Sequence, residues 1–416
     1  METVTIIGGG LAALSLALSL RKQDVPCAIY ELRDESYRKG GDIALAPNAL
    51  RVLDHVGAYG KARKLGYNYD TFEMMNSAGK SLGSFRNGGQ DLFSYSALRI
   101  NRDVVRKVLI EEVKVQRIPI HFNKKCVKVS ESEDQVMAHF EDGEIVSSKF
   151  LVGADGIHSR VRQYLYPGSE AQYSGLLVVL GHTTRDKIAQ TWDGAKVPCM
   201  YFGKDGAFTI LPSSYNGHEV GYFATLDVPD RGEEWDRLET DKEQIGQIFE
   251  EVVQDASWPT IVKDLLKATA LPDFRSWPFA KVPDLENYVS TSGRIILVGD
   301  AAHAIPPSGG QGAAMAFEDA ETLSYVLGKS SLPDYNQAKV TEGLRKWEKH
   351  RIQRMSEILD YTIRAGDMRK RSSMFLVQMM KEWTIWALFK FYKYRGGGPG
   401  WIYNYNAENI LGVVSG

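Results

Sequence analysis

Glycines and one acid near the N-terminus have the spacing of a turn that binds a dinucleotide. Gly8, Gly10 and Ala13 follow a β-branched run and open an apolar segment that extends to Leu20. In such a turn the first glycine permits a tight bend, the second lets the backbone approach a pyrophosphate, and the third position needs only a small side chain. Glu31 follows the next apolar run, where a carboxylate accepts hydrogen bonds from ribose hydroxyls. This context favours a nucleotide site over a glycine-rich turn that binds nothing.

Two later segments place an aspartate beside a glycine directly after a buried, strand-like run. The first pair is Asp155-Gly156 and the second is Gly299-Asp300. The second pair leads through His303 to a loop rich in proline and glycine. A plain NAD-dependent dehydrogenase needs neither segment, so these two segments bear on which dinucleotide is bound. We expect His303 to be a structural residue near this loop rather than a catalytic base.

The apolar patterns predict a βαβ unit and a parallel sheet at the N-terminus. Runs at 4–7 and 28–30 are expected to be strands on either side of a buried helix over 11–20. The remaining strands of this sheet are expected at 125–129, 135–140, 150–152 and 294–298. Helices are expected over 241–269, 312–327 and 341–363.

Between residues 173 and 228 the pattern changes to short strands joined by turns that contain Gly, Asn and Pro. These strands are expected at 176–180, 197–202, 207–211 and 219–226. The predicted fold class is therefore α/β, with a Rossmann-like domain, an inserted antiparallel-sheet domain and C-terminal helices. The expected boundaries are 1–170 with 286–365 for the discontinuous first domain, 171–285 for the substrate-binding sheet, and 366–416 for the helical tail.

Together the motifs resemble those of the class A FAD-dependent monooxygenases, the family of para-hydroxybenzoate hydroxylase, salicylate hydroxylase and kynurenine monooxygenase. The stretch 100–103, with Gly40-Gly41-Asp42 before it, is most similar to the tetracycline-inactivating members. The three motifs occur in the family's order, and the resemblance covers about residues 1–365. It implies an FAD-binding domain of the glutathione-reductase type.

The resemblance also implies which residues hold FAD. The first motif holds the AMP half, the Asp-Gly motif touches FAD and the path of the reductant, and the Gly-Asp motif binds the ribityl and pyrophosphate groups. The implied cofactor-binding residues are Gly8, Gly10, Ala13, Glu31, Gly41, Arg102, Asp155, Asp300, Gly310 and Gly312. Ala314 departs from the asparagine of many members, which leaves the polar contacts of the flavin open.

The loop that ends at a predicted helix N-terminus is suited to negative charge on the reduced flavin. Its backbone N–H groups can point at N1 and O2 of the isoalloxazine, and its glycines let the backbone come close. The loop residues expected near the isoalloxazine are Pro306, Pro307, Gly309, Gly310 and Gly312.

The implied activity is that of a single-component monooxygenase that uses NADPH or NADH and O2. In the family, oxygen adds to the reduced flavin to give a C4a-hydroperoxide, which hydroxylates or epoxidises a small organic substrate. Because the oxidising atom is on the cofactor, the protein mainly binds, orients and excludes water. We accordingly identify no metal site and no catalytic nucleophile in the sequence. The substrate, Baeyer–Villiger insertion and the choice between NADH and NADPH stay open.

The alternative functions are those of other flavoproteins with the same fold. A flavin-dependent halogenase is disfavoured because the sequence contains no Trp-x-Trp-x-Ile motif. A reductase of isoprenoid double bonds stays open as a second alternative. A non-catalytic carrier, as in the Rab escort proteins, is disfavoured by the intact Gly299-Asp300 pair.

Composition limits the partners and the compartment. The chain has 416 residues and a net charge of -2, which gives no basic field for nucleic acid. Three widely separated cysteines and the lack of a basic region before residues 11–20 lead us to expect a cytoplasmic protein without a signal peptide. The apolar tail at 374–392 is expected to pack on the FAD domain rather than lie on a membrane surface. The oligomeric state stays open.

Overall fold

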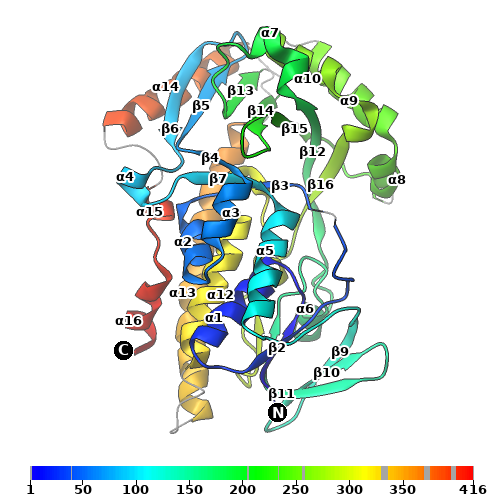
Figure 1. The fold of residues 1–416 in the computed structure, drawn as a ribbon, viewed down its shortest axis with the longest axis vertical. Helices are drawn as coiled ribbons and strands as arrows, with labels where there is room; N and C mark the ends of the chain where they lie inside the picture. Colours follow the sequence, from blue (N-terminus) through cyan, green and yellow to red (C-terminus); the bar gives the residue numbers. More distant parts are fainter. Residues whose placement is uncertain are drawn as a thin grey trace.

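The computed structural model describes residues 2–38, 40–203, 206–232, 234–254, 258–328, 336–369, 375–394 and 400–415. Its first sheet is built around the N-terminal strand, at the lower end of the molecule in Figure 1. β1 (Glu2–Ile7) pairs in parallel with β2 (Cys27–Tyr30) and with β11 (Ile145–Gly153). α1 (Leu11–Lys22) connects β1 to β2, and all its residues up to Leu20 are buried. The expected βαβ unit is confirmed.

Later parts of the chain complete this sheet, whose order is β8-β2-β1-β11-β10-β9 with β17 beside β11. β9 (Cys126–Glu131) and β10 (Val136–Phe140) form an antiparallel meander with β11. β8 (Ile120–His121) flanks β2. β17 (Ile295–Leu297) pairs in parallel with β11, so the chain returns to the first sheet as the sequence predicted.

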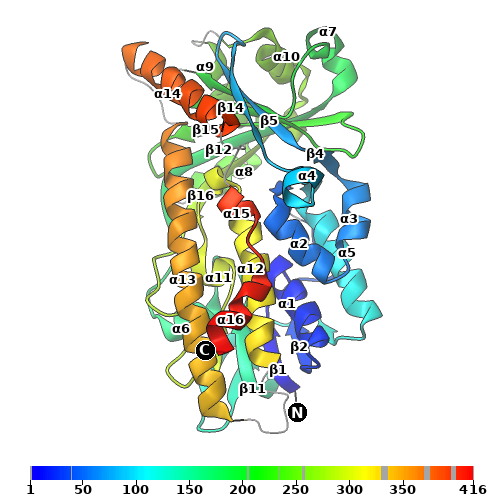
Figure 2. The ribbon, with the colours of Figure 1, turned by 90° about the vertical axis from the view of Figure 1, so that its left-hand side faces the viewer.

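Long helices pack around α1 and extend the core away from the sheet. α12 (Gly312–Gly328) packs along α1, and α5 (Arg102–Val115) packs against α1 as well. α13 (Gln337–Asp367) runs beside α12 and reaches from the lower lobe to the upper one (Figure 2). Trp347 of α13 is fully buried and donates its indole N–H to Thr322 of α12 at 2.9 Å.

The second sheet forms the upper lobe, in the order β16-β12-β15-β14-β13-β5-β6. All its pairings are antiparallel except that between β13 and β5. Its strands are β5 (Thr71–Asn76), β6 (Ser81–Arg86), β12 (Gln172–Thr184), β13 (Cys199–Gly203), β14 (Gly206–Pro212), β15 (Glu219–Asp227) and β16 (Arg275–Lys281). The sheet therefore takes two strands from chain that precedes residue 171, and the domain boundaries stay a prediction.

Helices cover one face of the second sheet around a cluster of aromatic side chains. α9 (Lys242–Gln254) places Phe249 against Phe208 and Tyr222 of the sheet. α10 (Thr260–Ala268) follows as a separate helix. The expected helical stretch 241–269 is thus two helices, and residues 255–257 between them lie outside the described part.

A small antiparallel sheet lies where the two lobes meet. It consists of β3 (Asp42–Leu45), β7 (Ala97–Asn101) and β4 (Tyr67–Tyr69), in that order. The helices α2 (Pro47–His55) and α3 (Tyr59–Leu65) follow β3 in the chain. None of these elements was expected from the sequence.

The C-terminal tail packs on both lobes. α14 (Phe375–Tyr394) lies on the edge strand β6 of the second sheet, not on the first sheet. α15 (Gly400–Tyr403) and α16 (Ile410–Ser415) descend along α13 and join the core of the first lobe (Figure 2). Within the described chain, no helix is long and apolar enough to span a bilayer.

The remaining elements are short and connect the two sheets and the helices. They are α4 (Gln90–Phe93), α6 (Arg160–Leu165), η1 (Arg185–Ile188), α7 (Ala189–Trp192), α8 (Glu234–Thr240), η2 (Leu271–Asp273), α11 (Asp300–His303), η3 (Pro307–Gly309) and η5 (Ala407–Asn409).

Candidate functional site

The glycine turn between β1 and α1 is tightly packed on one side and open on the other. Gly8 has φ +110°, and a Cβ there would lie 2.3 Å from the carbonyl oxygen of Ala154, the residue after β11. Only glycine fits that approach. A Cβ on Gly10, by contrast, would meet nothing within 4 Å. The first turn of α1 has no side-chain cap and no acid, so its N–H groups and positive dipole end can receive an anion.

Glu31 lies at this turn, as the sequence predicted. Its carboxylate accepts hydrogen bonds from the N–H of Gly9 and, at 2.7 Å, from the N–H of Arg33. These bonds fix the acid at the end of β2, beside the point where the ribose next to a bound pyrophosphate would lie.

Arg106 is a charged residue at the turn that the sequence analysis missed. It lies on α5, and its Nε donates to the carbonyl oxygen of Gly9 at 3.0 Å. Its Nη1 is buried and has no hydrogen-bond partner among the residues that the structure describes. A buried guanidinium N–H without an acceptor fits a phosphate oxygen. The signal that could have found it is its position one helical turn after Arg102.

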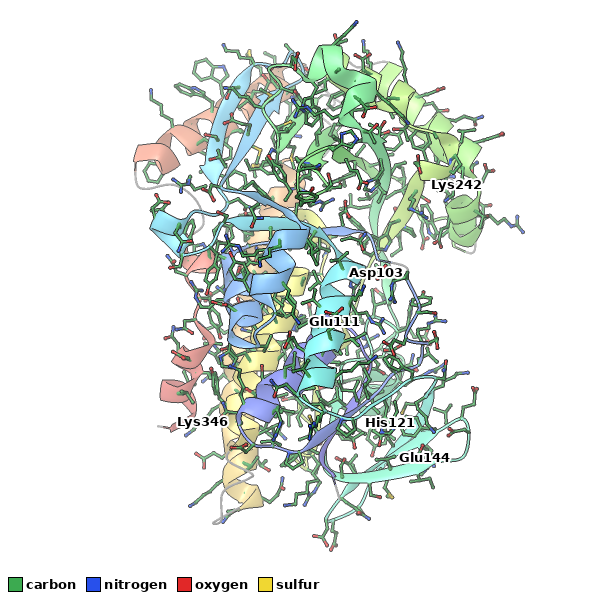
Figure 3. The ribbon with its side chains drawn as sticks, in the orientation of Figure 1. Asp103, Glu111, His121, Glu144, Lys242 and Lys346 are labelled. Atoms are coloured by element: carbon green, nitrogen blue, oxygen red, sulfur yellow. The ribbon has the colours of Figure 1, made fainter. Side chains whose placement is uncertain are left out.

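Gly41 and Arg102 are brought together at the start of α5. The N–H of Arg102 donates to the carbonyl oxygen of Gly41 at 3.0 Å, and the N–H of Gly40 donates to Asp103 at 2.9 Å. Asp103 lies near the upper end of α5 (Figure 3). A Cβ on Gly41 would meet nothing within 4 Å, and the side chain of Arg102 is exposed. Asp42, next in the chain after Gly41, pairs with Arg99.

Asp155 follows β11, directly behind the glycine turn. Its Oδ2 accepts hydrogen bonds from the N–H groups of Arg160 at 2.7 Å and Val161 at 3.3 Å. Its Oδ1 is buried and unpartnered. Burial raises the pKa of this carboxyl above its usual value, against the effect of these hydrogen bonds. One oxygen thus holds the start of α6, and the other has the capacity to bind a ligand.

The Gly299-Asp300 pair closes the same site from a third direction. A Cβ on Gly299 would lie 3.1 Å from the Cβ of Ala12, in the first turn of α1. The N–H of Gly299 donates to Asp319 at 2.8 Å. Within the described chain the carboxylate of Asp300 has no hydrogen bond and no ion pair. The three sequence motifs therefore meet at the N-terminus of α1.

The loop from residue 306 to 312 leads into α12. Gly310 has φ +64°, in the left-handed region, and a Cβ on Gly310 or Gly312 would meet nothing within 4 Å. Gly309 is packed instead, because its Cβ would lie 2.2 Å from Oγ1 of Thr362 on α13. The loop is thus anchored at Gly309 and open at the two glycines before the helix, where N–H groups of the first turn lack helical partners.

His303 belongs to a buried group of charges beneath this loop, as expected for a structural residue. Its Nε2 lies 2.5 Å from Oδ2 of Asp319, and Nε of Arg351 donates to Oδ1 of Asp319 at 2.7 Å. Burial by itself would raise the pKa of Asp319, but its interactions with His303 and Arg351 lower it to about 2. Arg351 and Arg354 also pair with buried Glu318, at 2.8 and 3.0 Å. The group fixes α12 to α13.

A second cluster of charges lies at the seam, by which we mean the contact of β3 and β7 with β12. Oδ2 of Asp42 lies 3.8 Å from Nη2 of Arg99 and 4.0 Å from Nε2 of His182. This Oδ2 and the Nε of Arg99 are buried without hydrogen-bond partners. Burial lowers the pKa of His182, against the opposing charge of Asp42. Sequence reasoning missed Arg99 and His182, since no spacing links residues so far apart.

The seam cluster and the loop before α12 are joined through α2. Asn48, just after β3, donates from Nδ2 to Oε1 of Gln311 at 3.1 Å and to Oε1 of Glu318 at 2.8 Å. The nucleotide site, the loop and the seam therefore form one continuous region between the lobes. Its unpartnered groups and open backbone fit a bound FAD: Nη1 of Arg106, Oδ1 of Asp155, and the glycines at 10, 41, 310 and 312.

Comparison with known proteins gives the same family as the motifs. The family model described as an FAD binding domain matches residues 1–360. 6-Hydroxynicotinate 3-monooxygenase from Bordetella bronchiseptica is 26% identical over 364 residues, which are 85% of this chain and 90% of that protein. Salicylate hydroxylase from Pseudomonas putida is 26% identical over 378 residues, 85% of this chain and 84% of that protein.

A solved structure extends the likeness to the fold. The crystal structure of Klebsiella pneumoniae HpxO complexed with FAD and uric acid has a TM-score of 0.76 at 20% identity and covers 100% of this chain and 96% of its own. The predicted fold class and the FAD-dependent monooxygenase activity are thus confirmed. The chain belongs to the FAD-binding-domain family of class A FAD-dependent monooxygenases.

Proposed function

We propose that this monooxygenase hydroxylates a small aromatic ring that already carries a hydroxyl group, and that the seam cluster binds that hydroxyl. The observation that carries the proposal is a pair of buried atoms at the seam without hydrogen-bond partners among the described residues, Oδ2 of Asp42 and Nε of Arg99, with the partly exposed His182 beside them. Buried polar atoms are nearly always hydrogen-bonded, so two of them facing one region favour a polar ligand there.

FAD is held, in this proposal, by the residues that converge on α1. The glycine turn and Arg106 take the pyrophosphate, and Glu31 takes the adenosine ribose. Asp300 and the free oxygen of Asp155 face the middle of the cofactor. The remaining proposed contacts are Ala13, Gly41 and Arg102. When bound, FAD receives hydride from NAD(P)H and transfers one oxygen atom from O2.

The loop at 306–312 would hold the ring end of FAD. The N–H groups at the start of α12 have no helical partners and lie at the positive end of a 17-residue helix. They are placed to stabilise negative charge on the reduced ring, in the manner of an oxyanion hole. The anchoring of Gly309 on α13 keeps these donors fixed while charge develops.

The seam cluster is suited to taking a proton from a substrate hydroxyl. Because burial lowers the pKa of His182, its imidazole is neutral at neutral pH and can accept a proton at Nε2. The carboxylate of Asp42 would then stabilise the positive charge on the imidazole, and the guanidinium of Arg99 would stabilise the negative charge on the substrate oxygen. Removal of a phenolic proton makes the ring carbons ortho and para to the oxygen more electron-rich, which favours attack on an electrophilic oxygen atom. One relative, 6-hydroxynicotinate 3-monooxygenase, acts by its name on a ring that carries a hydroxyl group.

The test is a panel of hydroxylated aromatic compounds with matched analogues that lack the hydroxyl. We expect some hydroxylated members to accelerate NAD(P)H oxidation and to gain one oxygen atom by mass, and their analogues to do neither. His182→Gln should lower kcat with that substrate by roughly 10²–10⁴-fold and keep FAD bound. His218→Gln is the matched control, because His218 is exposed on a turn of the same sheet. Equal rates with the analogues, or an unchanged His182→Gln enzyme, would reject the proposed role of the seam.

A further inference from the structure

The helix α14 is apolar nearly all round, but the fold covers only one side of it. On the inner side Ile385 and Phe389 are buried against β6. The packing is close, because a Cβ on Gly83 would lie 2.5 Å from the Cβ of Phe389. The ring of Phe389 stacks on that of Phe85 with centroids 5.9 Å apart. These contacts fix which side of the helix faces the protein.

The outer side of α14 is a stripe of large apolar side chains. Leu376, Met380, Trp383 and Trp386 are 58%, 67%, 67% and 44% exposed, and their spacing of three or four places them along one side of the helix. We call these four residues the outer stripe. A helix that is apolar all round is normally buried on every side. Figure 2 shows α14 at the outer edge of the molecule, and Figure 1 shows it beside β6. The outer stripe therefore has the character of a binding surface.

The charge of α14 on the side of the outer stripe is positive. Residues 375–394 contain three lysines and one glutamate. That glutamate, Glu382, is turned to the protein, where it accepts a hydrogen bond from Asn76 of β5 at 3.2 Å, and it accepts a second one from Gln378 of α14 itself at 3.0 Å. The ammonium of Lys390 lies 4.8 Å from the ring centroid of Trp386, beside the outer stripe. Among the described side chains of α14, none with a negative charge lies on this side.

We propose that the outer stripe binds the surface of an anionic lipid bilayer. Tryptophan rings lie at the level of the lipid head groups, where their N–H can meet water and their rings can meet acyl chains. Met380 and Leu376 would enter the acyl boundary, while Lys390 would extend to the phosphates. The helix would lie in the plane of the surface, since it is not apolar enough to cross the bilayer.

A second copy of the chain fits this surface less well. An antiparallel pair of α14 helices centred on Trp383 would place Lys390 of one copy against Leu376 of the other. The ammonium would lose water and gain no acidic partner, because the outer stripe has none. Anionic head groups supply the missing charge, and each lysine near such a surface strengthens binding.

The experiment is flotation of the FAD-loaded, full-length protein with vesicles. Vesicles of phosphatidylcholine with phosphatidylserine are compared with vesicles of phosphatidylcholine alone. We expect binding to the anionic vesicles that weakens with salt, and a blue shift of tryptophan fluorescence. Met380→Ser with Trp383→Ser should lower the partition coefficient at least about tenfold. Lys390→Glu should reduce the preference for anionic vesicles without changing apolar contacts.

Trp277→Ser is the matched control, since Trp277 is 54% exposed on β16, away from α14. This variant should bind vesicles as the wild type does, and all variants should retain FAD, because the changed side chains are exposed. Sedimentation of the protein without vesicles measures whether it forms a dimer. Absence of binding to anionic vesicles, equal binding by the stripe variants, or a dimer that depends on the outer stripe would each overturn the proposal.

Discussion

At the scale of single residues, Gly10 allows the nucleotide site to be tested without disturbing the fold. Gly10→Val places a side chain where the protein has nothing within 4 Å and where the backbone is extended, with φ −83°. The variant should therefore fold, but the valine would occupy the space that a pyrophosphate needs. We expect FAD to bind at least about tenfold more weakly, measured as the flavin-to-protein ratio and by titration.

Gly60→Val provides the control for that experiment. Gly60 is exposed on α3, and a Cβ there also meets nothing within 4 Å. This variant carries the same new side chain away from the turn, so it should retain FAD in full. If Gly10→Val retained FAD equally well, the glycine turn would not hold the pyrophosphate.

Residues with a motif could be located from the sequence, and residues without one could not. The turns of Gly8, Asp155 and Gly299 were expected at one site, and they do meet: a Cβ on Gly8 would lie 3.0 Å from Cα of Asp155, and one on Gly299 would lie 3.1 Å from Ala12 of α1. Arg99 and His182 come from different lobes, and only the packing of β7 and β12 gives them a common partner. Such a contact depends on the relative position of two sheets, which residue spacing does not record.

At the scale of elements, the open loop before α12 is suited to a conformational test. Gly310 has φ +64°, a conformation that costs a β-branched residue roughly 1–2 kcal/mol. Gly310→Val should shift this loop and misplace the N–H groups that would face the flavin ring. We expect slower flavin reduction, or a larger share of NAD(P)H consumption that yields hydrogen peroxide, both measured by rapid mixing.

Gly310→Asn separates the backbone conformation from the added side chain. Asparagine tolerates the left-handed region, so this variant should keep most of the wild-type rate and coupling. Wild-type rates in Gly310→Val would show that the loop does not position the ring. A loss in both variants would instead assign the effect to the space beside Gly310.

Runs of apolar residues predicted most of the larger elements, because an apolar run indicates that its segment is buried. The strands around Val4, Leu151 and Ile295 are apolar because helices or other strands cover both faces of the sheet. Which strands belong to the same sheet could not be predicted from such runs. Met74 of β5 lies opposite Met200 of β13 in a parallel pair, and nothing in either segment specifies a partner so distant in the chain.

At the scale of the whole molecule, the C-terminal segment and buried charges hold the first lobe together. Arg354 on α13 donates to the carbonyl oxygen of Ile402 at 3.1 Å, and its guanidinium lies 4.5 Å from the ring of Tyr405. Tyr403, fully buried, donates to Asn87 at 2.5 Å. The Arg354 contacts tie the C-terminal segment to α13, and the Tyr403 bond ties it to a residue 316 positions earlier in the chain.

Glu321 on α12 is a buried acid in this lobe, and its pKa leads to a prediction about how stability depends on pH. It is buried, accepts a hydrogen bond from Tyr325 at 3.0 Å, and lies 3.4 Å from Nδ1 of His55. Burial raises the pKa of Glu321 to about 7 and lowers the pKa of His55, so both groups favour their neutral forms. The contact is therefore not an ion pair at neutral pH.

A raised pKa means that the folded protein holds this proton more tightly than the unfolded chain does. The resulting stabilisation is complete below the unfolded pKa of 4.5 and is lost as the pH rises to about 7. Its size is about 3 kcal/mol for a shift of this order. The lowered pKa of His55 acts in the opposite direction, but His55 is the same in wild type and in Glu321→Gln, so the difference between them isolates Glu321.

Glu321→Gln should therefore remove a fall in the free energy of unfolding that the wild type shows between pH 5 and pH 8. Denaturant unfolding across this range, with FAD in excess, measures the difference directly. Glu111→Gln is the control, because Glu111 is exposed further down α5 (Figure 3) and its loss should leave the wild-type slope unchanged. Parallel curves for the wild type and Glu321→Gln would mean that Glu321 is ionised in the fold. In that case water or a nearby cation, such as Arg51 or Lys22, must compensate the charge.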